Sequence, residues 1–94
     1  MKQLTVLCSS DLSETVARTL ARAGVEGWLH VPEASAVRPG AAAEHGRYPR
    51  WPAEMFVVPA EDAQARAVVE ALREHTDNCE AEPCLRILVV PMET

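Results

Sequence analysis

Three residues in the C-terminal third of the chain carry side chains that are common metal ligands. Cys79 and Cys84 flank an acidic stretch, and His75 precedes Cys79 by about one helical turn. Thiolate and imidazole groups bind Zn(II) and Cu(I), and nearby carboxylates favour a cation. A structural zinc site normally uses two such cysteine pairs, whereas a two-thiolate Cu(I) site needs only one. The sequence therefore predicts a Zn(II) or Cu(I) site, with a reversible Cys79–Cys84 disulfide or inert loop cysteines as the alternatives.

A second group of candidates lies in residues 32–53, an irregular segment that divides the chain. Its four prolines and two glycines disfavour a helix or a central strand, so the segment is predicted to be a long loop insert. Loops of this length are usually functional or disordered. The cationic, imidazole and aromatic side chains in it are Arg38, His45, Arg47, Tyr48, Arg50 and Trp51. Because arginine and aromatic residues are enriched at interface hot spots, we expect this arm to bind a protein partner with an acidic surface; plain solubility is the alternative.

The sequence shows no arrangement of nucleophile, base and acid that would indicate an enzyme. Ser9, Ser10 and Ser13 stand at a predicted helix start, where N-capping explains them. Cys8 ends an apolar strand and is expected to be a small buried hydrophobe. We therefore predict a protein without enzymatic activity.

Length and charge narrow the class of protein further. The 94 residues fit a single domain spanning 1–94, and the net charge of −5 argues against nucleic-acid binding, which needs basic residues. The sequence has no apolar run long enough for a membrane helix and no signal sequence, so we expect a cytoplasmic protein without membrane insertion. Three cysteines, an odd number, do not suit a secreted disulfide framework.

Two similar halves, each with the order strand, helix, strand, flank the insert. The predicted strands are residues 3–8, 25–31, 54–58 and 85–90, and the predicted helices are residues 11–24 and 61–75. Asp11 is the expected N-cap of the first helix, and Gly24 is its expected C-terminal end. This order predicts an α+β fold: a ferredoxin-like β-α-β-β-α-β sandwich, with a four-stranded antiparallel sheet and two helices on one face.

The second predicted strand alternates strictly, which predicts the side chains that face away from the helices. Trp28 and His30 share the side expected to lack helices, and Leu29 and Val31 point to the other. In a monomer, the side without helices would be exposed to solvent. We therefore expect Trp28 and His30 to lie at a subunit interface.

In the order and lengths of its elements, the whole chain resembles the PII-like superfamily of small trimeric signalling proteins, with the CutA group as a close relative in fold. The most specific part is EMFVVPAEDAQARAVVEALREHT, residues 54–76, which looks like the third strand, proline turn and second helix of that family. The resemblance implies a homotrimer, with residues 32–53 in the place of the T-loop that contacts transporters or enzymes. It also puts residues 77–84 where PII proteins carry the B-loop, which binds nucleotide phosphate.

Residues 77–84 depart from that family pattern. They carry three carboxylates and no glycine, whereas a phosphate-binding loop needs close backbone approach and cationic side chains. Nucleotide binding is therefore the less favoured expectation. The sequence-based hypothesis is a homotrimeric, non-enzymatic regulatory protein that modulates a membrane transporter or another partner and is linked to copper or zinc homeostasis. Its alternatives are a CutA-like metal-binding protein and a PII regulator that senses adenine nucleotides.

Overall fold

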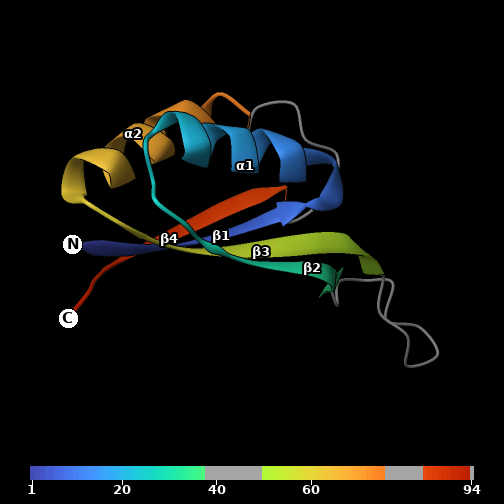
Figure 1. Ribbon diagram of the computed structural model, residues 1–94. Helices are drawn as coiled ribbons and strands as arrows, with labels where there is room; N and C mark the ends of the chain where they lie inside the picture. Colours follow the sequence, from blue (N-terminus) through green and yellow to red (C-terminus); the bar gives the residue numbers. More distant parts are fainter. Residues whose placement is uncertain (38–49, 76–83, 94) are drawn as a thin grey trace.

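The sheet at the centre of the fold has four strands, and both helices lie on one of its faces (Figure 1). The computed structural model describes residues 1–37, 50–75 and 84–93. Its elements are β1 (Lys2–Ser9), the 3-10 turn η1 (Ser10–Leu12), α1 (Ser13–Arg22), β2 (Leu29–Val37), β3 (Arg50–Ala60), α2 (Asp62–Arg73) and β4 (Leu85–Pro91). The strand order is β2-β3-β1-β4, and neighbouring strands are antiparallel. The predicted α+β, ferredoxin-like β-α-β-β-α-β sandwich is confirmed.

Alternate residues of the two central strands point toward the helices and form the core. Leu4, Val6 and Cys8 of β1 are fully buried, as are Phe56 and Val58 of β3. Cys8 is thus the small buried hydrophobe that its apolar setting predicted. Removal of these side chains from water is the main favourable term in the folding of so small a domain.

Both helices bury the stripe that their sequence period predicts. Val16 and Leu20 of α1 are fully buried, and Ala65, Val68 and Leu72 of α2 are buried against the same core. These positions recur every three or four residues, as one face of an α-helix does. Neither described helix is long and apolar enough to cross a membrane.

The start of α1 differs from the prediction, whereas its end agrees with it. The chain forms a 3-10 turn at Asp11 and begins α1 at Ser13, with no side-chain cap at either start. The predicted Asp11 cap is therefore wrong. At the other end, Gly24 has a φ of 80°, the left-handed conformation that glycine adopts most readily. The Gly24 amide donates to the carbonyl of Ala21 at 3.1 Å, which closes the helix.

A single amide side chain connects this end of α1 to the start of α2. Gln64 Oε1 accepts a hydrogen bond of 2.9 Å from the Glu61 amide, and the Glu61 side chain completes a capping box. Gln64 Nε2 donates to the carbonyl oxygen of Gly24 at 3.0 Å. One side chain therefore fixes the helix of the first half of the chain to the helix of the second.

The predicted loop insert, residues 32–53, is shorter than expected because both flanking strands, β2 and β3, extend into it. Pro32 is tolerated at a register shift in β2, where Glu33 has a φ of 59°. Pro52 is tolerated because β1 pairs with β3 only from Ala53 onward, so β3 has a single neighbouring strand at Pro52. In both places the sheet can lack one backbone donor, so these prolines do not end the strands.

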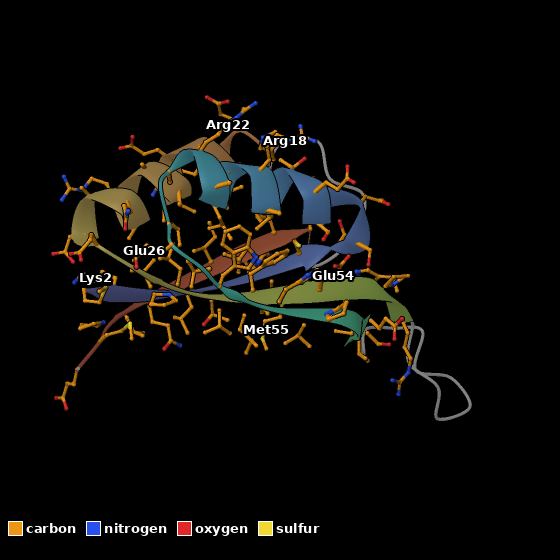
Figure 2. The ribbon with its side chains drawn as sticks, viewed as in Figure 1. Lys2, Arg18, Arg22, Glu26, Glu54 and Met55 are labelled. Atoms are coloured by element: carbon orange, nitrogen blue, oxygen red, sulfur yellow. The ribbon has the colours of Figure 1, made fainter. Side chains whose placement is uncertain are left out.

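The sheet face opposite the helices is mostly apolar, and no described element covers it. We call it the uncovered face; its residues are Gln3, Thr5, Leu7, Leu29, Val31, Met55, Val57, Pro59, Arg86, Leu88 and Val90. Leu29 and Leu88 are each 61% exposed, and Met55 projects from this side of the sheet in Figure 2. A monomer would leave these side chains in water, so the face has the character of an interface.

Candidate functional site

Polar and sulfur-bearing side chains gather at the end of the sheet where β1 finishes. There Ser9 pairs with Ala53 of β3, and the Ser9 amide donates to the carbonyl of Cys84 at 3.0 Å. The 3-10 turn that follows Ser9 leads directly into α1 at Ser13. Strands β1 and β3, the start of β4 and the start of α1 therefore converge on one site, at the right of Figure 2 beside Glu54.

The central residue of this site is Glu54, which lies on the covered side of β3. Its Oε1 atom accepts a hydrogen bond of 2.8 Å from Ser13 Oγ and lies 2.6 Å from His30 Nε2. The Glu54 side chain is only 13% exposed, so its charge needs these partners. The His30 ring stacks on Phe56, with the ring centroids 4.3 Å apart and the planes inclined by 7°. The cluster thus joins β2, β3 and α1.

The surroundings of Glu54 change the pKa of two groups. Burial alone raises the pKa of the Glu54 carboxyl, but hydrogen bonds from Ser13 and His30 act against it. The charge of His30 and a hydrogen bond from Ser10 lower it further, so this pKa lies below its ordinary value of 4.5. Burial, and secondly the negative charge of Glu54, raise the pKa of the Cys8 thiol to about 11. At neutral pH the site therefore holds a carboxylate beside a protonated thiol.

The order of these groups decides what the cluster can do. Ser13 donates its proton to the carboxylate and not to the imidazole. His30 is therefore not placed to remove the serine proton, as the general base of a nucleophilic triad would be. Glu54 instead bridges two side chains, and its contacts hold the edge strand β2 and the start of α1 against β3. The cluster acts as a structural connection between elements.

Two of the three predicted metal ligands lie close together. Cys84 is buried, and its Sγ atom lies 3.8 Å from the carbonyl oxygen of His75, just after α2. Cys84 is disulfide-bonded, so in this state it offers no thiolate to a metal. Cys79 lies outside the described residues. In the described part of the chain, no three His, Cys, Asp or Glu side chains are grouped as a metal site. Zn(II) or Cu(I) binding stays a prediction, and it requires the reduced protein.

Two of the predicted partner-binding residues lie on β3. Arg50 is exposed at the start of the strand, and Trp51 pairs with Ala36 of β2. The Trp51 Nε1 atom is buried and has no hydrogen-bond acceptor among the residues that the structure describes. Outside the described residues lie Arg38, His45, Arg47 and Tyr48. The pair of strands β2 and β3, which we call the β2–β3 ribbon, therefore carries an indole donor that no described residue accepts from.

The predicted placement of Trp28 and His30 on the face without helices needs correction. In the structure β2 starts at Leu29, so the stretch before it does not alternate as a strand. His30 pairs with Phe56 and points to the covered side, where Glu54 is its partner. Trp28 lies at the sheet edge, where it packs against the core and also lines a pocket of about 350 Å³ beside Leu29. A role at a subunit interface stays a prediction for both residues.

Sequence reasoning missed Glu54 and Ser13 as site residues. The signal for Glu54 was its position, because it shares the period-two alternation of Phe56 and Val58. A carboxylate in that series has to face the helices and find a partner there. No comparable signal marks Ser13, because capping ordinarily explains a serine at a helix start.

The known proteins that this chain is similar to share its fold. No protein-family model and no curated protein matches the sequence. Among solved structures, CPII from Thiomonas intermedia K12, a nitrogen regulatory PII-like protein bound to ADP, AMP and bicarbonate, matches with a TM-score of 0.71. The identity is 17%, and the match covers 95% of this chain and 86% of the CPII chain. This chain has the PII-like fold.

Two further structures extend the PII-like comparison. The apo form of CPII matches with a TM-score of 0.70 at 16% identity, over 95% of this chain and 85% of that chain. CutA1 from Oryza sativa matches with a TM-score of 0.65 at 13% identity, over 99% of this chain and 80% of that chain. The resemblance to PII-like and CutA proteins is thus confirmed at the level of the fold. At these identities, what this chain binds has to be argued from its own residues.

Proposed function

We propose that the protein is a homotrimeric, PII-like regulatory protein that acts in the cytoplasm without enzymatic activity. It binds a small ligand between its subunits and in response modulates a membrane transporter or another protein. The observation that carries this proposal is the uncovered face of the sheet, because exposed apolar surface of this extent marks a protein interface.

The uncovered face supports self-association of the chain. Leu29 of β2 and Leu88 of β4 lie on the two edge strands and are each 61% exposed, and Leu7 of β1 is exposed between them. Each square ångström of apolar surface removed from water contributes about 25 cal/mol. Three copies that turn this face toward a common axis would cover the side that the helices leave open, which supports a closed trimer.

The β2–β3 ribbon supports a role in partner binding. The Trp51 indole N–H is buried and has no acceptor among residues 1–37, 50–75 and 84–93. A buried donor without an acceptor costs about 1–3 kcal/mol, which an acceptor on a partner would recover. The exposed Arg50 adds a positive charge beside it. The remaining members of the proposed surface are Arg38, His45, Arg47 and Tyr48. A partner with an acidic surface fits this set.

Two ligand classes compete, and a different observation favours each. CPII, which has the same fold, was solved with ADP, AMP and bicarbonate, and this favours an adenine nucleotide or bicarbonate. The thiol and imidazole side chains of Cys79, Cys84 and His75 in the sequence favour Zn(II) or Cu(I), in a regulator linked to heavy-metal homeostasis or in a CutA-like metal-binding protein. We place the nucleotide and bicarbonate first, because Cys84 is disulfide-bonded, although the carboxylates of residues 77–84 weigh against phosphate.

Native mass spectrometry of the purified protein tests the assembly. We expect a trimer for the wild type and a monomer for the Leu29→Asp, Leu88→Asp variant, because charges on the uncovered face resist burial. Arg18→Asp is the matched control and should remain trimeric, since Arg18 projects from α1 away from the sheet (Figure 2). A wild type that stays monomeric at micromolar concentration would contradict the proposal.

Isothermal titration calorimetry of the same trimer tests the ligand. Heat of binding with ADP or bicarbonate supports a nucleotide or bicarbonate sensor. Binding of Zn(II) or Cu(I) by the reduced protein, lost in Cys84→Ser, supports the metal-linked alternative. A trimer that binds none of these four ligands would refute control by a ligand of either class.

A further inference from the structure

A β-bulge in β2 sets how the end of this strand pairs with β3. Before the bulge Val31 pairs with Met55, and after it Ala34 pairs with Ala53. Two residues of β2 therefore face one residue of β3 at this point. Glu33, one of the two, has a φ of 59°. A residue other than glycine is uncommon in this left-handed region and persists there only where surrounding contacts hold it. The bulge is thus a strained point in the β2–β3 ribbon.

Without the bulge, residues 34–37 would pair with β3 in a register shifted by one position. We call this the unbulged register and the observed one the bulged register. A continuation of the pairing that precedes the bulge would place Glu33 opposite Ala53 and Ser35 opposite Trp51. Because strand side chains alternate between the two faces of a sheet, every side chain after the bulge would then point to the other face. The two registers therefore present different surfaces of the same strand.

Pro32 does not oppose the unbulged register. The Ser9 amide donates to the Cys84 carbonyl just before β4, so the backbone groups of Cys8 face β3. Cys8 pairs with Glu54, and the backbone groups of Glu54 therefore point to β1 and away from β2. In the unbulged register Pro32 would lie opposite Glu54, in a pair that exchanges no hydrogen bonds. Its missing N–H would cost nothing there.

Side-chain burial distinguishes the two registers only weakly. The bulged register places Ala34 and Ala36 on the same side as the uncovered face and leaves Glu33 exposed. It also leaves Val37 42% exposed on the helix side. In the unbulged register Val37 would move to the apolar side, together with Glu33 and Ser35. Because an alanine side chain removes little apolar surface from water, the hydrophobic pattern gives the bulged register a small advantage.

The polar surroundings of Trp51 also differ between the registers. In the bulged register Trp51 pairs with Ala36, whose methyl group accepts no hydrogen bond. The buried Nε1 atom has no acceptor among residues 1–37, 50–75 and 84–93. In the unbulged register Ser35 would lie opposite Trp51 on the same face and bring a hydroxyl oxygen within reach of the indole. The unbulged register therefore offers the indole N–H an acceptor.

We propose that β2 is a register switch, in which residues 34–37 pair with β3 in either the bulged or the unbulged register. An apolar surface that covers this side of the ribbon selects the bulged register, because it excludes the Glu33 carboxylate. Exposure of the same side to water favours the unbulged register, in which Glu33 no longer needs a positive φ. Contact with the ribbon thus changes which side chains β2 presents, without a shift of β3. The switch operates in a monomer as well as in a trimer, so it does not depend on the proposed assembly.

Substitution of Glu33 tests the switch in the full chain, because only the bulged register needs a positive φ. Glu33→Gly fits this conformation and should hold the bulged register, whereas the β-branched side chain of Glu33→Val should select the unbulged register. NMR contacts between Hα atoms distinguish the two, since opposite residues approach most closely in pairs that exchange no hydrogen bonds. We expect Pro52 to contact Ser35 in Glu33→Gly and Ala34 in Glu33→Val.

Exchange of the Trp51 indole hydrogen gives a second readout. Its rate should fall about tenfold in Glu33→Val relative to Glu33→Gly, because the Ser35 hydroxyl accepts from it only in the unbulged register. The further substitution Ser35→Ala in Glu33→Val should restore the faster rate. Glu26→Gly and Glu26→Val are the matched controls, since Glu26 is exposed and precedes β2. They should change neither the Hα contact nor the exchange rate.

A Ser35–Pro52 contact that persists in Glu33→Val would overturn the proposal. Loss of both contacts would also overturn it, because the strand would then separate from β3 instead of changing register. If circular dichroism shows that Glu33→Val does not fold, relaxation dispersion of the wild type decides. Exchange at residues 34–37 that Glu33→Gly suppresses supports two registers, and a wild type without such exchange contradicts them.

Discussion

The two faces of the sheet distribute charged and apolar groups in opposite ways. The covered face, beneath the helices, holds the cluster of Glu54, His30 and Ser13 beside the fully buried Phe56. The uncovered face carries Leu, Val and Met side chains on all four strands. A monomer in water would favour the reverse arrangement. The difference teaches that polar groups on the covered face connect elements internally, while the uncovered face is suited to contact another protein surface.

The largest expected difference between the two faces is in how much a truncated side chain lowers the free energy of unfolding. Phe56→Ala removes a buried ring that also supports the His30 ring, so the free energy of unfolding should fall by about 3–5 kcal/mol. Leu88→Ala, on the uncovered face, should act on assembly and weaken the dependence of the melting temperature on protein concentration. Urea denaturation and thermal scans at several concentrations measure the two effects. A loss below about 1 kcal/mol for Phe56→Ala would mean that the covered face is not the core.

The polar cluster is expected to give the next largest effect. Glu54→Gln keeps the side-chain shape but removes the charge that His30 and Ser13 contact, so stability at neutral pH should fall by about 1–3 kcal/mol. Glu14→Gln is the matched control, because the Glu14 side chain is 93% exposed and pairs only loosely with Arg18, at 4.0 Å. That control should lose less than about 0.5 kcal/mol. Urea denaturation of both variants measures the difference, and equal losses would remove any structural role for the cluster.

The smallest expected effect is a change with pH in the stability that Glu54 contributes to the covered face. The pKa of Glu54 is lower in the folded chain than its ordinary value of 4.5. At pH values between the folded-state pKa and 4.5, the unfolded chain therefore binds more protons than the folded chain. The contribution of Glu54 is therefore complete above that ordinary value and is lost as the pH falls through the folded-state pKa. The stability gap between the wild type and Glu54→Gln should shrink in acid. Denaturation curves from about pH 7 to about pH 3 measure it, and a gap that stays constant would contradict the proton linkage.

The order of elements and the core were predictable because both depend on local sequence periods. Val16 and Leu20 recur at helical spacing, and Phe56 and Val58 alternate along a strand, so each buried face follows from neighbours in the chain. The left-handed turn at Gly24 was predictable for the same reason, since it depends on one residue type at one helix end.

The polar cluster was not predictable, because it depends on contacts between distant residues. Ser13 and Glu54 are 41 positions apart, and His30 is 24 positions from Glu54. The alternation of residues 25–31 suggested a strand but did not show where pairing would start. Pairing of His30 with Phe56 then decided which face the imidazole joined. The strand extensions past Pro32 escaped sequence reasoning because the tolerance of a strand for proline depends on the number of its neighbours.

The two hydrogen bonds of the Gln64 side chain couple local unfolding at one helix end to local unfolding at the other. Its amide group bonds at once to the first turn of α2 and to the Gly24 carbonyl after α1. Fraying of either helix end breaks a hydrogen bond that holds the other, so the exchange of amide hydrogens at the two ends should follow one shared opening event. The two β-α-β halves, which look like independent repeats along the chain, are in this respect one cooperative unit.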